Sequence, residues 1–313
     1  MWFKQATLFQ LSDPVLYKPD RLEEQLAQLS FKSCLPSMPS SAGWVSPIDK
    51  EDAPLVHAAN GYLLMCLQLE EKVLPAAVVR QELDERIKTI AATQDRKVSQ
   101  KEKFALKDEI IHTLLPRAFS KFSRIYATIY TKNKWLIIDT TTPSKVEKFL
   151  NLFKRSMDKV CYQTIETKKI SPILTQWLLH DDCPRSFSIE KNCVLRDPNQ
   201  ETRIIRCQQQ DLSASAIQSL LKDGCEVQQL SLNWQDKINF ILVDDFTLKN
   251  MKYSDEILNR AKDNYGETLE QQFDADFYIM TELLSELLTS LLNLFSKNKP
   301  KQKSKPMLEA LME

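Results

Sequence analysis

The chain has 313 residues, and its 42 Lys and Arg balance its 42 Asp and Glu, so the formal net charge is 42 − 42 = 0. With 43% hydrophobic and 27% charged residues, the composition is that of an ordinary soluble globular protein. No apolar run approaches the roughly 20 residues that a membrane span requires, so no membrane partner is expected. The four glycines are too dispersed to build a phosphate-cradling loop or a dinucleotide fingerprint, which excludes Walker-type ATPases and standard Rossmann enzymes.

Cysteine and histidine usage indicates neither a disulfide framework nor a metal site. The seven cysteines are odd in number and dispersed, and none forms a Cys-x-x-Cys pair, which favours reduced thiols and a cytoplasmic protein. His180 lies three residues before Cys183, but no second His/Cys pair completes a four-ligand site. We therefore expect no metal and no cofactor.

The first half of the chain predicts a mixture of strands and helices with a helical hairpin between them. In chain order we expect a strand at 3–11, a helix at 20–29, a loop at 36–52, a strand at 62–69, helices at 75–92 and 99–114, strands at 121–130 and 135–139, and a helix at 143–157. Ser99 and Glu102 match a capping box, and Pro116 ends the helix that they begin. The hairpin arm accordingly covers about 75–116.

The second half, about 170–296, is predicted to be a further α+β region. Its expected elements are a helix at 172–179, strands at 187–195 and 202–208, a helix at 214–222, a strand meander at 227–232, 238–243 and 247–253, and a long helix at 269–295. Leu283, Leu288 and Leu292 widen the apolar face of the last helix, which leaves packing on a sheet and a dimer seam both open. Residues 297–313 are predicted to form a lysine-rich flexible tail. The predicted class is α+β, with antiparallel sheets, packed helices and a projecting helical hairpin.

Positive charge gathers in one part of this neutral chain. Residues 96–134 hold ten Lys/Arg and three Asp/Glu, a net charge of 10 − 3 = +7. Residues 236–288 hold five Lys/Arg and twelve Asp/Glu, a net charge of 5 − 12 = −7. Bases interleaved with aromatic residues such as Phe122 and Tyr126 suit a polyphosphate ligand, although a solvated helix face and a sheet edge guarded by lysines would look alike. The candidate residues for binding such a ligand are Arg96, Lys97, Lys101, Lys107, Arg117, Lys121 and Arg124.

Two enzymatic interpretations are weak. Asp244, Asp245, Asp274 and Asp276 could hold Mg²⁺ in a nuclease, but the first pair also suits a turn between strands and the second pair suits the first turns of a helix. Cys183 has His180 nearby, yet the adjacent acids Asp181 and Asp182 disfavour its thiolate. We expect no catalytic residues and no enzyme activity.

A set of short motifs, in order along the chain, resembles the bacterial RdgC family. The most specific is Leu114-Leu115-Pro116-Arg117-Ala118-Phe119-Ser120, followed by Phe122-Ser123. Further matching pieces are Trp2-Phe3-Lys4, Gly43-Trp44-Val45, Ala59-Asn60-Gly61, Glu70-Glu71-Lys72, Lys107-Asp108-Glu109, Gln210-Asp211-Leu212 and Phe273-Asp274-Ala275-Asp276-Phe277. The resemblance runs from residue 2 to about 290, which makes 1–296 one family-like module.

The resemblance implies a nucleoid-associated protein of the cytoplasm, not an enzyme. It would be a ring-shaped homodimer that binds double-stranded DNA with little sequence preference and modulates recombination by restraining the access of RecA to DNA. Phe119 matches the family's finger at the dimer interface, and Gln210 matches a second interface position; a core position for Phe119 is the alternative. Gln208, Gln209 and Cys225 stand where relatives can carry lysines, so contacts made by those lysines are not expected here. The alternative function is a protein–protein adaptor without direct DNA contact.

Overall fold

The computed structural model describes residues 1–12, 18–48, 50, 53–157 and 161–296, so the lysine-rich tail lies outside the described residues. The chain divides into two compact units that interleave along the sequence. Unit 1 contains residues 1–11, 135–141 and the described chain from Tyr162, and unit 2 contains the described parts of 12–134 and 142–161. In both units the strands pair antiparallel, which confirms the α+β class.

Unit 2 is built on two long strands, β4 (Tyr62–Val73) and β5 (Phe119–Tyr130), which pair without a shift in register from end to end. β3 (Val56–Ala59) pairs with the first part of β4, and β2 (Ser40–Val45) pairs with its second part. Both long strands extend beyond the lengths that the sequence predicts, because their distal ends pair with each other where apolar periodicity has already stopped.

β2 corrects the prediction of a loop over 36–52. Its Ser, Ala and Gly residues carry little strand propensity, but every residue pairs with β4, and Trp44 at its end is buried. A Cβ at Gly43 would collide with the backbone of Phe31, so this strand needs glycine there. Tertiary pairing therefore overrides local propensity.

One face of this sheet is covered by α4 (Pro143–Ser156), at the position where the sequence predicts a helix. The Trp44 ring lies 5.3 Å from the Phe149 ring in an edge-to-face contact, and the Trp44 Nε1 donates a hydrogen bond to the Ser156 Oγ at 2.8 Å. Leu22 and Leu26 of α1 (Pro19–Ala27) are also fully buried. These contacts form the core of unit 2.

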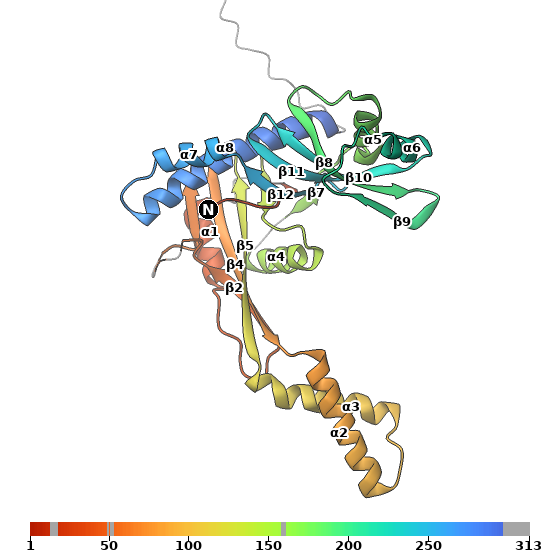
Figure 1. Cartoon of the computed structure of the whole chain (residues 1–313). Coiled ribbons are helices and arrows are strands. Elements are labelled where there is room, and N and C mark those ends of the chain that lie inside the picture. Colours follow the sequence, from red (N-terminus) through yellow and green to blue (C-terminus); the bar gives the residue numbers. More distant parts are fainter. Residues whose placement is uncertain (13–17, 49, 51–52, 158–160, 297–313) are drawn as a thin grey trace, which may run out of the picture. The chain divides into compact units, whose positions relative to one another are not determined.

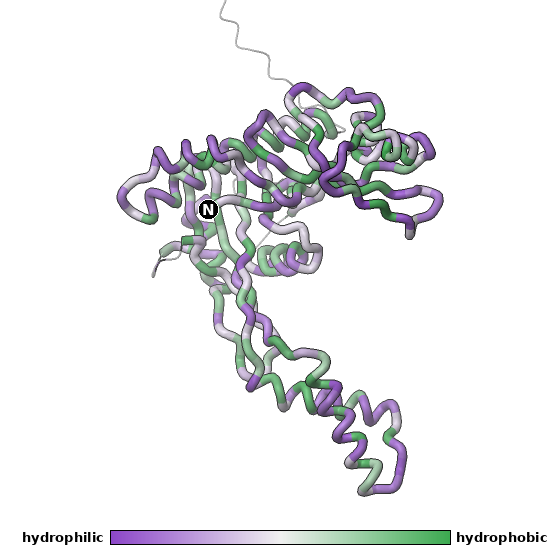
Figure 2. Tube along the Cα trace, in the orientation of Figure 1, coloured by the Kyte–Doolittle hydropathy of each residue, from purple (hydrophilic) through white to green (hydrophobic). Residues whose placement is uncertain are grey.

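The predicted helical hairpin is confirmed, and it connects the far ends of β4 and β5 (Figure 1). It consists of α2 (Ala76–Gln94), α3 (Gln100–Leu114) and the short 3-10 turn η1 (Leu115–Arg117), and both hydrogen bonds of the Ser99–Glu102 capping box are present. α2 buries a single residue, Val79, and α3 likewise buries a single residue, Ile110. Figure 2 shows hydrophilic and hydrophobic residues mixed along both helices, and most of their residues are exposed or half-buried.

Unit 1 contains a five-stranded sheet in the order β12 (Leu248–Tyr253), β11 (Ile238–Val243), β10 (Glu226–Trp234), β8 (Phe187–Asp197) and β9 (Gln200–Cys207). The predicted meander is the first three of these strands. β1 (Thr7–Leu11) pairs with β6 (Trp135–Ile138) on one side and with β7 (Tyr162–Thr164) on the other.

Four helices belong to unit 1: α5 (Ile170–His180), α6 (Ser215–Lys222), α7 (Asp255–Asp263) and α8 (Leu269–Phe295). α8 has the predicted bounds, and Leu283 and Leu288 are buried in the single chain, so they are unavailable as a dimer seam. The sequence prediction missed α7 together with the short strands β3 and β7. Among the described residues, no helix has the length and apolar character needed to cross a membrane.

Asp139 is a half-buried carboxylate at the end of β6. Its Oδ1 accepts hydrogen bonds from the backbone N–H groups of Gln5 at 2.8 Å and Lys4 at 2.9 Å. Burial outweighs these bonds and raises the pKa of Asp139 from 3.8 to about 6. The folded state therefore holds this proton more tightly than the unfolded state does, and the associated stability is lost as the pH rises through about 6.

We expect Asp139→Asn to become more stable relative to the wild type as the pH increases. The amide oxygen can still accept from Gln5 and Lys4, but it carries no charge to bury. Denaturant unfolding of both proteins at about pH 5 and about pH 8 should show the difference in unfolding free energy growing by on the order of 1–2 kcal/mol. A difference that stays constant over this range would contradict the raised pKa.

Candidate functional site

The predicted DNA-binding bases of the hairpin are all exposed. Lys97 lies in the α2–α3 loop, Lys101 and Lys107 lie on α3, and Arg117 lies at the end of η1. Within the described residues, no ion pair to an acid involves any of these four side chains. These four bases therefore place positive charge on the solvent-exposed surface of the helical hairpin.

Arg96 differs from its neighbours because its charge is matched locally. Its Nη2 and Nη1 donate to the two carboxylate oxygens of Glu102, at 2.8 Å and 3.0 Å. The Arg96 bond, with help from the Ser99 backbone N–H, lowers the pKa of Glu102 to about 2. Arg96 therefore fixes the start of α3, and it adds less to the outward field than the lysines do.

On β5 the register places Lys121 and Arg124 on opposite faces of the sheet. Lys121 pairs with Glu71 and shares a face with Ile125, which is buried on the α4 side. Arg124 pairs with Gln68, and its Nε donates to the Gln68 Oε1 at 3.3 Å on the other side. A single ligand on one face of this ribbon would contact one of the two bases directly.

The face of Lys121 carries two further bases that the sequence analysis missed. The Lys148 Nζ on α4 donates to the Glu71 Oε1 at 2.5 Å, and this bond lowers the pKa of Glu71, with smaller contributions from Lys121 and Lys145. We call Lys121, Lys145 and Lys148 the α4-face cluster. The i,i+3 spacing of Lys145 and Lys148 shows that they share a helix face. Sequence alone does not show that this face meets the strand carrying Lys121.

Apolar side chains are exposed on the same arm. Phe119, the first residue of β5, is 86% exposed, and Phe104 on α3 is 62% exposed. The first value excludes the alternative that Phe119 is a core residue within one chain. We call the following set the arm surface: Val73, Val78, Phe104, Phe119 and Phe122. A group of exposed large apolar residues on a small element is typical of a protein contact.

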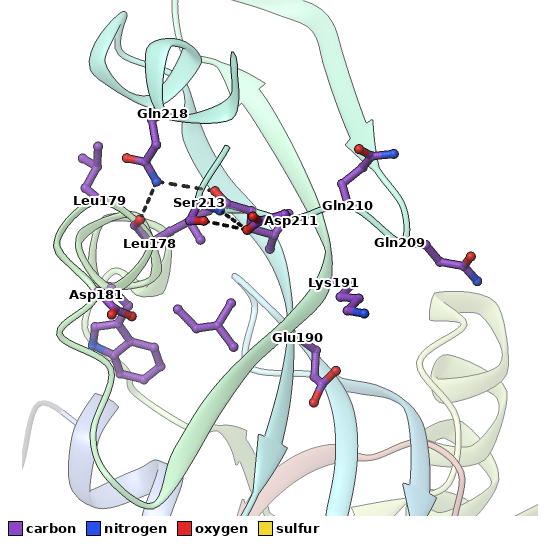
Figure 3. Close-up of a pocket in the computed structure, with 13 residues that line it drawn as sticks. Leu178, Leu179, Asp181, Glu190, Lys191, Gln209, Gln210, Asp211, Ser213 and Gln218 are labelled. Atoms are coloured by element: carbon purple, nitrogen blue, oxygen red, sulfur yellow. Dashed lines mark hydrogen bonds between the residues drawn. The ribbon is translucent and has the colours of Figure 1, made fainter. Parts of the chain in front are cut away.

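Gln210 belongs to unit 1, where it borders a cavity of about 630 Å³ that Figure 3 shows in close-up. Its backbone N–H donates to the Lys191 carbonyl at 3.0 Å, and its side chain is exposed. Asp211 beside it accepts from the N–H and hydroxyl of Ser213 at 2.9 Å and 2.6 Å, which lowers the pKa of Asp211. The cavity wall combines Trp177, Leu178 and Leu212 with the polar residues that Figure 3 labels.

The acids considered for a nuclease have other partners. The Asp245 Oδ1 accepts from the N–H and hydroxyl of Thr247 at 3.0 Å and 2.6 Å in the turn between β11 and β12. The Asp276 Oδ2 accepts from the Met1 amine at 2.7 Å, and its Oδ1 accepts from the Tyr265 hydroxyl at 2.9 Å. Asp244 and Asp274 are exposed. In the part of the chain that the structure describes, no three His, Cys, Asp or Glu residues are placed to hold a metal ion.

Cys183 has the environment of an unreactive thiol. Burial, and then the negative charges of Asp182 and Asp181, raise its pKa to about 11. Nothing in this geometry provides the thiolate that a nucleophilic cysteine requires.

Comparison with known proteins places this architecture in one family. The family model described as "Putative exonuclease, RdgC" matches residues 1–298. The recombination-associated protein RdgC of Yersinia enterocolitica serotype O:8 is 35% identical over 294 residues, which cover 93% of this chain and 97% of that protein. The proteins of the same name from Yersinia pestis strain Pestoides F and Yersinia pseudotuberculosis serotype O:1b match to the same extent. The chain belongs to the RdgC family of recombination-associated proteins.

Proposed function

We propose that this protein binds double-stranded DNA without sequence preference, as a nucleoid-associated homodimer of the cytoplasm. By occupying DNA it would restrain the access of RecA and so modulate recombination. The observation that carries the proposal is the set of exposed bases on unit 2 in a chain of zero net charge. Separated positive and negative regions let a neutral protein present a cationic surface to phosphates.

Self-association would concentrate this charge further. A two-fold axis doubles each basic surface, so a neutral chain can still enclose a strongly positive region. We propose that Phe119 makes one dimer contact, because its ring is almost wholly exposed next to other exposed apolar residues. Gln210 would make a second contact, through its side-chain amide. Gln208 and Gln209 lie beside it, so amide hydrogen bonds would replace charge at that interface.

The proposed role is binding and not cleavage, although the matching family model carries the word exonuclease in its description. The carboxylates of Asp245 and Asp276 already accept hydrogen bonds from nearby donors. The raised pKa of Cys183 disfavours the thiolate that a nucleophile would need. An adaptor function without DNA contact would also use the exposed arm surface. The salt dependence of binding to duplex DNA separates the adaptor from the proposed DNA-binding protein.

We propose that DNA lies against the α4-face cluster more closely than against Arg124. The three bases of the cluster and the one acid among them, Glu71, leave a net charge of 3 − 1 = +2, whereas Arg124 is a single base beside the neutral Gln68. Lys101, Lys107 and Arg117 would extend the contact along the hairpin.

Binding to duplex DNA is expected to weaken steeply with salt and to vary little with sequence. Each phosphate that the protein neutralises adds about −0.9 to the slope of log K against log salt concentration. Fluorescence anisotropy with several unrelated duplexes across a salt series measures both properties, and gel analysis of the same samples with Mg²⁺ reports cleavage. A slope near zero would favour the adaptor, and nicking that survives repeated purification would favour a nuclease.

Removing single charges should identify the face that contacts DNA. Lys121→Gln is expected to flatten the salt slope by about 0.9, the value for one phosphate contact, and Arg124→Gln is expected to flatten it less. Lys222→Gln, an exposed lysine on α6 of unit 1, is the matched control and should leave the slope unchanged. A larger effect of Arg124→Gln would move the contact to the opposite face of β5.

Phe119→Ala is expected to weaken the dimer while leaving the fold intact. Because the ring is exposed, its loss should change the unfolding free energy by less than about 1 kcal/mol. Ile125→Ala on the same strand removes a fully buried side chain and should cost about 2–5 kcal/mol. Sedimentation equilibrium should show a shift towards monomer for Phe119→Ala alone, and an unchanged dimer would remove Phe119 from the interface.

A further inference from the structure

Two cysteines lie directly opposite each other on neighbouring strands of unit 1. The antiparallel register of β8 and β9 pairs Cys193 with Cys207, so both side chains point to the same face of the sheet. Opposed residues in such a pair have Cα atoms about 4.5 or 5.5 Å apart, and disulfides span about 4.4–6.8 Å. In the strand pairs described, no other two cysteines are opposed.

The two thiols are close enough to influence each other electrostatically, yet they differ in access to solvent. Cys193 is buried on β8, between two neighbouring strands, whereas Cys207 is half-exposed at the end of the edge strand β9. Both line a cavity of about 340 Å³, together with Arg206 and Gln208. A small reagent can therefore reach Cys207 first, with Cys193 behind it.

We propose that Cys193 and Cys207 form a reversible disulfide when the chain meets a low-molecular-weight disulfide such as oxidised glutathione. The opposed register supplies both the geometry and the proximity of the two thiols, and the cavity supplies the entry path.

The exchange proceeds in two balanced steps. Cys207 loses its proton and its sulfur attacks one sulfur of oxidised glutathione, which breaks that S–S bond and releases one glutathione thiolate that takes up a proton. Cys193 then loses its proton and attacks the Cys207 sulfur, which releases the second glutathione. Two protein thiols are oxidised and one glutathione disulfide is reduced to two thiols. Burial raises the pKa of Cys193, which lowers the fraction of its thiolate and slows the second step.

The disulfide would act on the segment that follows β9. Cys207 directly precedes Gln208, and the next residues are tied to β8 by two hydrogen bonds: from the Gln209 N–H to the Asn192 Oδ1 and from the Gln210 N–H to the Lys191 carbonyl, both at 3.0 Å. A covalent link at Cys207 would hold this segment, and with it the side chain of Gln210, against β8. Any effect on self-association rests on the proposed role of Gln210 in the dimer.

Peptide mapping of the full chain tests the link. The protein is incubated in mixtures of oxidised and reduced glutathione, free thiols are blocked, and trypsin digestion is analysed without reduction. Trypsin cuts after Lys191, Arg196, Arg206 and Lys222, which separates the two cysteines into different peptides. We expect the peptide 192–196 to appear linked to the peptide 207–222, and reduction to release both.

Cys193→Ser and Cys207→Ser should each abolish the linked peptide, while Cys225→Ser, which changes another buried cysteine of unit 1, should retain it. Native circular dichroism of each variant shows that the fold is kept. Free thiols at both positions in excess oxidised glutathione, or a link from Cys207 to a different cysteine, would overturn the proposal. The mapping requires neither DNA nor a dimer, so failure of the proposed function would leave its result unchanged.

Discussion

The continuous register between β4 and β5 is the constraint on which the rest of unit 2 depends. From Tyr62 opposite Tyr130 to Val73 opposite Phe119, the pairing has no bulge, so every side chain has a fixed face. A slip by one residue would move Ile125 out of the core and exchange the faces of Lys121 and Arg124. The same pairing fixes the ends from which the hairpin helices start and return. Fold stability and the placement of the proposed contacts thus share one cause.

A chain of zero net charge has a positive surface on its hairpin because some of the basic side chains there are ion-paired and others, within the described residues, are exposed without an ion pair to an acid. Arg96 and Glu102 neutralise each other where α3 begins, and the Arg86 guanidinium binds the Glu109 carboxylate at 2.8 Å between the two hairpin helices. These exposed pairs add little stability, but they set local geometry. Lys97, Lys101 and Lys107 are left facing solvent, so the hairpin carries local positive charge although the net charge of the chain is zero.

Local signals in the sequence predicted every described α-helix except α7. The capping box at Ser99, the bounds of α8 and the helix α4 all follow from periodicity and capping residues, which act within a few positions. The sequence did not predict β2, whose Ser40–Val45 segment is a strand because β4 pairs with it. Likewise, Lys145 and Lys148 join Lys121 only through packing of α4 on the sheet, and the Cys193–Cys207 pair exists only through register. Each of these depends on contacts between residues far apart in the chain.

Chemical footprinting of lysines tests most directly whether DNA lies along the basic surface of unit 2, as we propose. Acetylation of the folded protein, with and without a duplex, followed by mass spectrometry reports each amine separately. The account predicts protection by DNA at Lys97, Lys101, Lys107, Lys121, Lys145 and Lys148, with Lys222 and Lys262 of unit 1 modified equally in both states. Protection confined to lysines outside unit 2, or no protection under conditions where binding is observed, would contradict it.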